Sequence, residues 1–471
     1  MAPGDDAMTA LWQCTATELV AGFRAKQWSP KEALDSVLER LEAVNPGLNA
    51  VIALADDAQE AAERSSLRYI EGRPLSPLDG VPISIKDNLL LAGVPATWGT
   101  TALRHWIPDH DELPVARLRQ AGAVLFAKTN APEFTLEGYT DNPVYGVTGS
   151  PWAPALTPGG SSGGAAAAVA AGIGPLALGT DGGGSIRRPA AHCGLVGLKP
   201  SIGTVPRADG FPQILLDFEV AGPLARCVED AALMLNVLEG ACLEDRQSWM
   251  EHSGRRTTAS RVLCVSSLPG CPVDPQIRRH VEKAATTFSR MGLEVVFDTL
   301  PLELAALNEI WSEVGQIGLA HLAETHPTWL EHASPKYQDM ANAGARLPAS
   351  RLWHTLDVVS CLRRQVDTLF TSTDMLLMPS IAALSWPASQ AYPPTIDGQP
   401  VGPRGHAVFT GWVNAAGNPA INLPVEPSHE GLPIGLQLIG PWQSEHLLLD
   451  LAQRYQRLAP WKARYADLWE R

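Results

Sequence analysis

Residues 157–188 read TPGGSSGGAAAAVAAGIGPLALGTDGGGSIRR, with two turns rich in glycine and serine on either side of an alanine-rich segment. No charged side chain occurs from Asn142 to Thr180, although 18% of the residues in the chain are charged. A long run without charge predicts burial deep inside the fold. Buried hydroxyl and N–H groups must find hydrogen-bond partners, so this stretch predicts a functional site as well as a core.

The second turn places three glycines directly before a serine, Ser185. Glycine adopts positive φ and allows close backbone approach, so several consecutive N–H groups can point toward one position. Such a set of donors binds an oxyanion, and here it stands beside a hydroxyl that can act as a nucleophile. The backbone N–H groups of Gly182, Gly183, Gly184 and Ser185 are therefore the predicted oxyanion hole.

A lysine upstream is the candidate base. In residues 80–88, GVPISIKDN, Ile83 and Ile85 alternate with Ser84 and Lys86, which predicts a short strand ending at the lysine. A lysine can remove a proton from a serine hydroxyl only when it is neutral. Lowering its pKa from ~10.4 to about 7 requires roughly 4–5 kcal/mol, which desolvation among uncharged residues can supply.

Taken together, these segments resemble the amidase signature family. The matching residues are Lys86, Gly159–Gly164, the motif GTDGGGSIR at 179–187, GLVGLKP at 194–200, and the segments 414–424 and 431–438. The resemblance implies an α/β fold in which helices cover both faces of a large mixed central β-sheet. It also implies one compact amidase domain over residues 1–471, with a signature core at about 75–230 and a less family-like helical substrate-pocket region at about 300–375.

The resemblance further implies a Ser-cis-Ser-Lys triad. Ser185 is the nucleophile, Ser161 the bridging serine and Lys86 the base, and the spacing of the two serines is that of the family. The family has a cis peptide bond before the bridging serine, here after Gly160, and Ser162 supports the same network.

Two positions near Ser185 bear on substrate choice. Gly182 stands where the family usually has threonine or another residue with a side chain, so a more flexible loop is expected. Arg188 lies at the offset where malonamidase-like members carry an arginine that binds the carboxylate of their substrate. A guanidinium can bind a carboxylate through two parallel hydrogen bonds. The competing interpretation is an internal ion pair or a solvent-exposed arginine, because such arginines are common.

The predicted function is an amidase that cleaves a carbon–nitrogen bond of a linear amide through a Ser185 acyl-enzyme, without a metal or organic cofactor. Three alternatives stay open: the glutaminase subunit of a tRNA-dependent amidotransferase, an esterase, and a catalytically silent binding protein with the same fold. Glutaminase subunits carry an acidic residue shortly before the Phe-Thr that precedes the late asparagine. The stretch His406-Ala407-Val408-Phe409-Thr410 contains none, which weakens glutamine recognition.

Other motifs are weaker. Residues 159–163 match the G-x-S-x-G elbow of α/β-hydrolases, but 155–158 is not the hydrophobic strand that the elbow needs. Neither glycine turn has the spacing of a phosphate-binding loop. His321 and His326 are five residues apart, about 140° around a helix, and fit no zinc motif, so no metal site is expected.

Composition limits the partners and the compartment. A net charge of −14 disfavours nucleic acid and anionic membranes as partners. Residues 1–30 contain no signal peptide pattern, and prolines and glycines interrupt the long uncharged segment. The seven cysteines form no C-x-x-C pair, which indicates reduced thiols in the cytoplasm. The expected partner is a small-molecule amide, with a homodimer as an open alternative.

Local patterns predict the order of the elements. A capping box at 29–32 begins a helix that is expected to stop at 45–47. Strands and helices alternate around 83–128 and again around 262–297, which indicates a parallel or mixed sheet. Two further helices are expected at 302–325 and 351–372, and a long loop at 387–405.

Overall fold

The central feature of the fold is one sheet of eleven strands, described by a computed structural model that covers residues 10–249 and 258–470. The strands lie in the order β1-β3-β2-β4-β6-β5-β12-β13-β9-β7-β8. Their bounds are β1 Val51–Leu54, β2 Pro82–Lys86, β3 Val124–Thr129, β4 Leu176–Asp181, β5 Val196–Lys199, β6 Val220–Ala225, β7 Arg261–Cys264, β8 Glu294–Phe297, β9 Met375–Pro379, β12 Ala420–Pro424 and β13 Gly435–Ile439. Strand β2 pairs in parallel with β3 and β4, and antiparallel pairs join the middle of the sheet, so the predicted mixed sheet is confirmed.

Fifteen α-helices surround this sheet within the described residues. Their bounds are α1 Ala16–Arg24, α2 Pro30–Leu48, α3 Ala58–Ile70, α4 Leu113–Gln120, α5 Gly163–Ala171, α6 Arg187–Cys193, α7 Val228–Leu238, α8 Pro275–Arg290, α9 Ala305–Thr325, α10 Pro327–Glu331, α11 Pro335–Ala345, α12 Ala349–Leu369, α13 Gly411–Ala416, α14 Glu445–Leu458 and α15 Ala463–Trp469. A short hairpin of β10 Thr395–Ile396 and β11 Gln399–Pro400 lies within the predicted loop.

The connections put helices on both faces of the sheet. The chain moves from β2 to β3 through α4, and then back past β2 to β4 through α5. Right-handed crossovers that run in opposite directions along a sheet place their helices on opposite faces. Helix α7 packs with α4 and α14, whereas α6 packs with α5. The expectation of helices on both faces is therefore confirmed.

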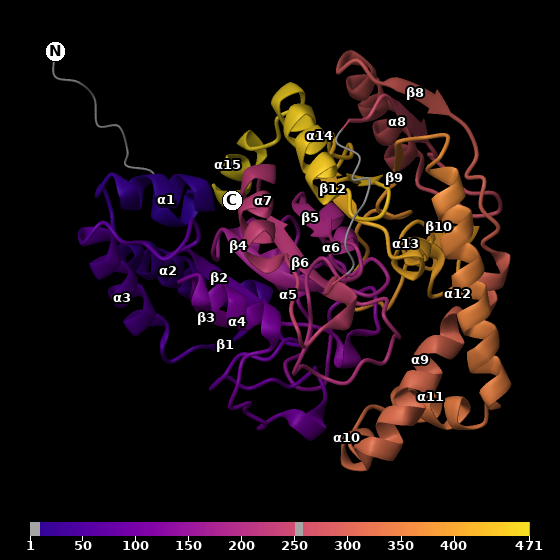
Figure 1. Ribbon diagram of the computed structural model, residues 1–471, viewed down its shortest axis with the longest axis horizontal. Helices are drawn as coiled ribbons and strands as arrows, with labels where there is room; N and C mark the ends of the chain where they lie inside the picture. Colours follow the sequence, from indigo (N-terminus) through magenta and orange to yellow (C-terminus); the bar gives the residue numbers. More distant parts are fainter. Residues whose placement is uncertain (1–9, 250–257, 471) are drawn as a thin grey trace.

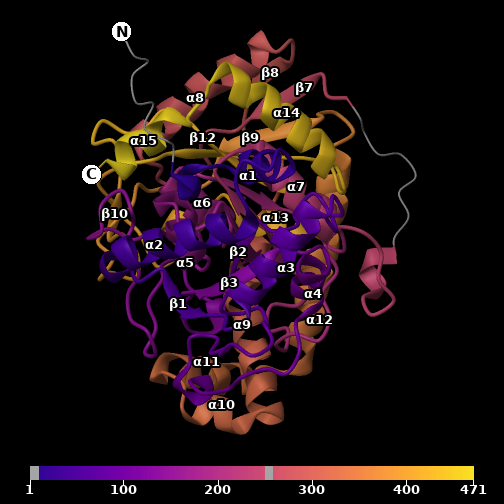
Figure 2. The same cartoon turned by 90° about the vertical axis from the view of Figure 1, so that its left-hand side faces the viewer.

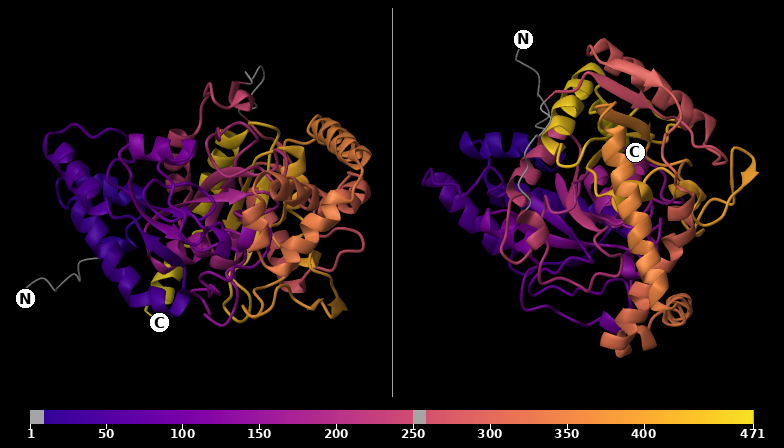
Figure 3. Two further views of the ribbon diagram at one scale, coloured as in Figure 1. Left: turned by 90° about the horizontal axis from the view of Figure 1, so that it is seen from below. Right: turned by 45° about the vertical axis from the view of Figure 1, so that its right-hand side comes forward.

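Helices α9 to α12 form the side of the molecule farthest from the N-terminal helices. Figures 1 and 3 show α9 to α12 along one side and α1 to α3 along the other. Figure 2 shows β7, β8 and α8 at the opposite end from α9, α10 and α11. Across residues 10–249 and 258–470, no helix has both the length and the apolar character needed to cross a membrane.

One helix end differs from the expectation. Helix α2 continues through Pro46 and ends at Leu48, and the residue that follows it, Asn49, has a left-handed φ of 52°. The side-chain oxygen of Asn45 accepts the backbone N–H of Ala50 at 2.9 Å and so holds the turn that follows the helix. The predicted stop at 45–47 was wrong because this tertiary turn tolerates a proline inside the last turns of the helix.

The strands that carry the site are completely buried. Every residue of β2, β3 and β4 is buried, as are all nine residues of α5. The edge strands β1 and β8 are partly exposed. The alanines of α5 keep this helix close to the sheet, and it contacts β1, β2, β3, β4 and β6. Residues 157–180 of the charge-free run therefore lie in the middle of the molecule, whereas residues 143–147 and 151–156 of the same run are partly or fully exposed, so the predicted burial holds only for the second part.

Candidate active site

Two neighbouring strands bring Lys86 to the serine turns. Strands β2 and β4 are parallel, with Ile85 opposite Leu178, so their carboxyl ends meet at the same edge of the sheet. At this edge the ammonium group of Lys86 donates to the hydroxyl of Thr180 at 2.8 Å. It also donates to the hydroxyl of Ser161 at 2.7 Å. The predicted base and bridging serine are thus in direct contact.

Burial changes the acidity of Lys86. Its side chain has no exposed surface, and loss of hydration lowers its pKa from 10.5 to about 7. The negative charges of Glu219 and Asp181 act in the opposite direction and favour the protonated form. Since desolvation is the largest effect, a large fraction of Lys86 is neutral near pH 7.

The two serine turns lie side by side. The peptide bond between Gly160 and Ser161 is cis. The next residue, Ser162, donates its backbone N–H to the carbonyl oxygen of Ser185 at 3.1 Å, and its hydroxyl donates to the carbonyl of Thr180 at 3.1 Å. Ser162 thereby ties the first turn both to strand β4 and to the residue that is the expected nucleophile.

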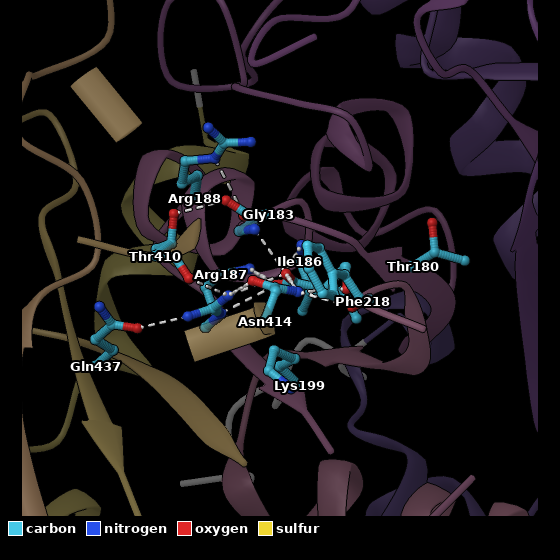
Figure 4. A network of polar contacts seen from close by, with 12 residues as sticks. Thr180, Gly183, Ile186, Arg187, Arg188, Lys199, Phe218, Thr410, Asn414 and Gln437 are labelled. Carbon is cyan, nitrogen blue, oxygen red and sulfur yellow. Dashed lines mark hydrogen bonds and ion pairs between the residues drawn. The ribbon is translucent and has the colours of Figure 1, made fainter. Parts of the chain in front are cut away.

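A buried ion pair holds the second turn. Arg187 donates to both carboxylate oxygens of Asp181, each at 3.0 Å, and neither side chain has any exposed surface. Figure 4 shows Arg187 extended toward Asn414 and Gln437, whose oxygens accept hydrogen bonds at 2.5 and 2.8 Å. The charge of Arg187 and these hydrogen bonds hold the pKa of Asp181 far below its usual range, against the effect of burial. The carboxylate is therefore ionised at neutral pH.

Asp181 also accepts hydrogen bonds from backbone N–H groups of the glycine loop, residues 182–186. Its carboxylate accepts the N–H of Gly184 at 2.6 Å and that of Ile186 at 3.1 Å. The N–H of Gly184, one of the donors predicted for the oxyanion hole, is thus already engaged by Asp181. Among the described residues, the N–H groups of Gly182, Gly183 and Ser185 have no acceptor.

An acidic group near Lys86 was not predicted from the sequence. Thr180, whose hydroxyl binds Lys86, lies 3.4 Å from a carboxylate oxygen of Glu219 and accepts the amide of Asn88 at 3.0 Å. Arg207 donates to Glu219 at 2.6 Å. Glu219 lies between the apolar residues Phe218 and Val220, but Asp217 is only two residues away, so the sequence does not single it out and only the tertiary contact reveals its target.

The remaining candidates lie around the same loop. Arg188 is 7% exposed and donates from Nε to the carbonyl of Gly184 at 3.3 Å. Figure 4 shows that its guanidinium extends away from the Arg187 network. His192 is buried, its Nε2 lies 3.1 Å from the carbonyl oxygen of Ala383, and loss of hydration lowers its pKa to about 4. His192 is thus a packed, neutral histidine.

Within the described part of the chain, no cluster of three or more His, Cys, Asp or Glu side chains could bind a metal. His321 lies in α9, whereas His326 follows the end of that helix and packs against Trp329. His321 therefore belongs to helix α9 and His326 to the turn after it, so the two do not lie on one face of a helix.

Comparison with known proteins identifies the family of the chain. The family model Amidase matches residues 32–449. The chain is 32% identical to an acylamidase of Rhodococcus erythropolis, over 95% of this chain and 96% of that protein. It is also 32% identical to a glutamyl-tRNA(Gln) amidotransferase subunit from a Cyanothece strain, over 96% and 99% of the two chains.

A solved structure supports the same assignment. The crystal structure of a bacterial aryl acylamidase of the amidase signature family superposes with a TM-score of 0.90 and 28% identity, covering 98% of this chain and 100% of that one. Both the family model and this likeness extend over almost the entire sheet. The chain therefore belongs to the amidase signature family of hydrolases.

Proposed function

We propose that this protein is an amidohydrolase in which Ser185 attacks the carbonyl carbon of an amide, with Ser161 and Lys86 as the proton relay. The observation that carries the proposal is the 2.7 Å hydrogen bond between Lys86 and Ser161 in a site where burial lowers the pKa of the lysine to about 7. A general base is most effective when its pKa lies near the working pH.

The chemical steps follow from these roles. The Ser185 hydroxyl gives its proton to Ser161, which passes its own to neutral Lys86, and the Ser185 oxygen bonds to the carbonyl carbon. The oxyanion accepts hydrogen bonds from the N–H groups of Gly182, Gly183 and Ser185. The proton on Lys86 returns through Ser161 to the leaving nitrogen as the C–N bond breaks. A water molecule then releases the acid from the acyl-enzyme by the same relay.

The electrostatic surroundings of the two serine turns favour the negative charge that develops on the reacting oxygen atoms. Helix α5 begins at Gly163, two residues after Ser161, so the positive end of its dipole lies close to the relay. Asp181, although negative, is balanced by Arg187 and keeps the loop in position through Gly184 and Ile186. We assign Ser162 a supporting role because it joins the two serine turns.

Labelling with a fluorophosphonate probe tests the assignment of the nucleophile. We expect the probe to react with Ser185 in the wild-type protein and not with Ser185→Ala, and peptide mass spectrometry identifies the labelled residue. Ser185→Ala removes one oxygen atom, so circular dichroism should stay unchanged. Labelling of Ser161 with Ser185 untouched would overturn the proposal, and a wild-type protein that takes no label would indicate a silent binding protein.

A second candidate function is the glutaminase step of tRNA-dependent amidation. It is favoured by the 32% identity to the glutamyl-tRNA(Gln) amidotransferase protein of Cyanothece. It is disfavoured by residues 406–410, which carry no carboxylate to bind the amino group of glutamine. Ammonia release from glutamine, compared with release from simple aliphatic and aryl amides, separates the two functions. Matched esters in the same assay measure the esterase alternative.

A further inference from the structure

The loop between Asp181 and Ser185 has no side chain of its own to fix its peptide planes. Residues 182–184 are all glycine, and Gly184 has a positive φ of 117°. Glycine populates many backbone conformations, so the direction of the N–H groups in this loop depends on partners outside it. The peptide unit that joins Gly183 to Gly184 has such a partner at each end.

The two ends of this peptide unit are bound by different side chains. The N–H of Gly184 donates to the carboxylate of Asp181 at 2.6 Å. The carbonyl oxygen of Gly183 accepts the hydroxyl proton of Thr410 at 2.7 Å (Figure 4). Within residues 10–249 and 258–470, no other donor reaches this carbonyl oxygen. Because the C=O and N–H of a trans peptide point in opposite directions, the two contacts together fix the plane of the unit.

The hydroxyl of Thr410 is committed to this contact. Thr410 directly precedes α13 and has no exposed surface. A threonine at this position commonly accepts an N–H of the first helical turn, but the side chain of Thr410 makes no such bond. The carbonyl of Ala407, at 3.4 Å, is a more distant acceptor than that of Gly183. A hydroxyl has one proton, so Thr410 cannot also donate to an oxyanion.

The backbone that carries Thr410 is anchored to the same loop by other contacts. Asn414, one turn into α13, donates its side-chain amide to the carbonyl oxygen of Asp181 at 2.7 Å. Arg187 donates to the carbonyl oxygen of Thr410 at 3.2 Å. Neither contact uses the Thr410 hydroxyl, so both remain when that hydroxyl is removed. The hydroxyl can therefore be tested without releasing α13 from the loop.

We propose that Thr410 is a positioning residue of the reaction: its hydroxyl holds the peptide plane between Gly183 and Gly184, and this keeps the N–H groups of Gly183 and Ser185 directed at the carbonyl oxygen of the substrate. The inference rests on the proposed amidohydrolase function and adds to that site a residue from the C-terminal part of the chain. Without the hydroxyl, the peptide unit is held at one end only. The effect falls on the step in which the oxyanion forms, because an oxyanion hole acts on the charge that develops there.

Replacement of Thr410 by Val tests the inference, because valine has a similar shape and no donor. Thr410→Val should lower kcat by about 10–100-fold, with KM little changed, for a 4-nitroanilide that the wild-type protein cleaves. Loss of one oxyanion donor costs about 10²–10³-fold, and here the donors remain but lose their fixed direction. The rising limb of the pH profile should stay in place because the relay of Lys86 and Ser161 is untouched. Thr410→Ser, which keeps the hydroxyl, should retain most of the wild-type kcat.

Thr355→Val is the matched control. Thr355 is a buried threonine of α12 whose hydroxyl has no hydrogen-bond partner among the described residues, so this variant should keep the wild-type kcat. If circular dichroism shows that Thr410→Val does not fold, Thr410→Cys provides the same test, because a thiol is only a weak donor. An unchanged kcat in the variant without the hydroxyl, an equal loss in Thr410→Ser, or a rise in KM with kcat unchanged would each overturn the inference.

The rate of fluorophosphonate labelling separates this inference from the proposed function. In the labelling step the Ser185 oxygen bonds to phosphorus, fluoride leaves, and the phosphoryl oxygen takes the place of the oxyanion. We expect Ser185 to be labelled about 10-fold more slowly in Thr410→Val than in the wild-type protein. Equal labelling rates would overturn the role of Thr410 and leave the proposed hydrolysis intact. A wild-type protein that takes no label would overturn the hydrolysis and, with it, this inference.

Discussion

Glu219 offers a quantitative test of Lys86 as the base. Replacement of Glu219 by Gln removes a negative charge that favours protonated Lys86, while the new amide can still accept a hydrogen bond from Arg207. If neutral Lys86 is the active form, kcat/KM rises with pH through a pKa of about 7 in the wild-type protein. Glu219→Gln should lower this pKa and move the rising limb to lower pH.

The geometry sets the size of the shift. Lys86 and Glu219 are joined through the hydroxyl of Thr180 by contacts of 2.8 and 3.4 Å, so their charges lie within about 6 Å of each other. At about 6 Å, two unit charges interact by about 3 kcal/mol at an effective dielectric constant of 20 and by about 0.7 kcal/mol in water. One pKa unit corresponds to about 1.4 kcal/mol, so a shift of about 0.5–2 units is expected.

The assay is the pH dependence of kcat/KM from pH 5 to 10 with one 4-nitroanilide that the wild-type protein cleaves. Glu63→Gln is the control, because Glu63 is an exposed residue of α3 whose loss changes the net charge by the same amount. The position of the limb does not depend on the overall rate, so a partial loss of activity leaves the test valid. A limb that stays in place, or moves to higher pH, would refute the assignment of Lys86.

Three other changes probe the site. Lys86→Ala should reduce kcat/KM by about 10²–10⁴-fold and abolish the rising limb, whereas an unchanged profile in that variant would point to a histidine as the base. Asp181→Asn leaves the buried charge of Arg187 uncompensated and should lower the free energy of unfolding by about 3–5 kcal/mol, measured by denaturant unfolding. A loss below ~1 kcal/mol would contradict a stabilising buried ion pair. Gly184→Ala adds a methyl group 2.3 Å from the Thr410 hydroxyl at a φ of 117°, so kcat should fall sharply, and wild-type kcat would show that the loop tolerates the displacement.

Local sequence patterns predicted the alternation of strands and helices and pointed to Lys86 and Ser185 as candidate groups of the site. The uncharged run before Thr180 indicated burial, and alternation in residues 83–86 indicated a strand ending at Lys86. Burial and the strand end can both be predicted locally. A buried strand is recognised by its own apolar side chains, and its end is recognised by the residues that follow it. The resemblance to the amidase signature family rested on the same short segments, and the family assignment and the mixed sheet are confirmed.

The tertiary structure decided which polar groups are already engaged. Gly184 looks like any other donor in the sequence GGGS, yet Asp181 folds back onto it and removes it from the oxyanion hole. Glu219 lies 3.4 Å from the Thr180 hydroxyl that binds Lys86 only because β4 and β6 are neighbours in the sheet. Hydrogen-bond partners and charge balance depend on distances between segments far apart in the chain, and no local propensity encodes these distances.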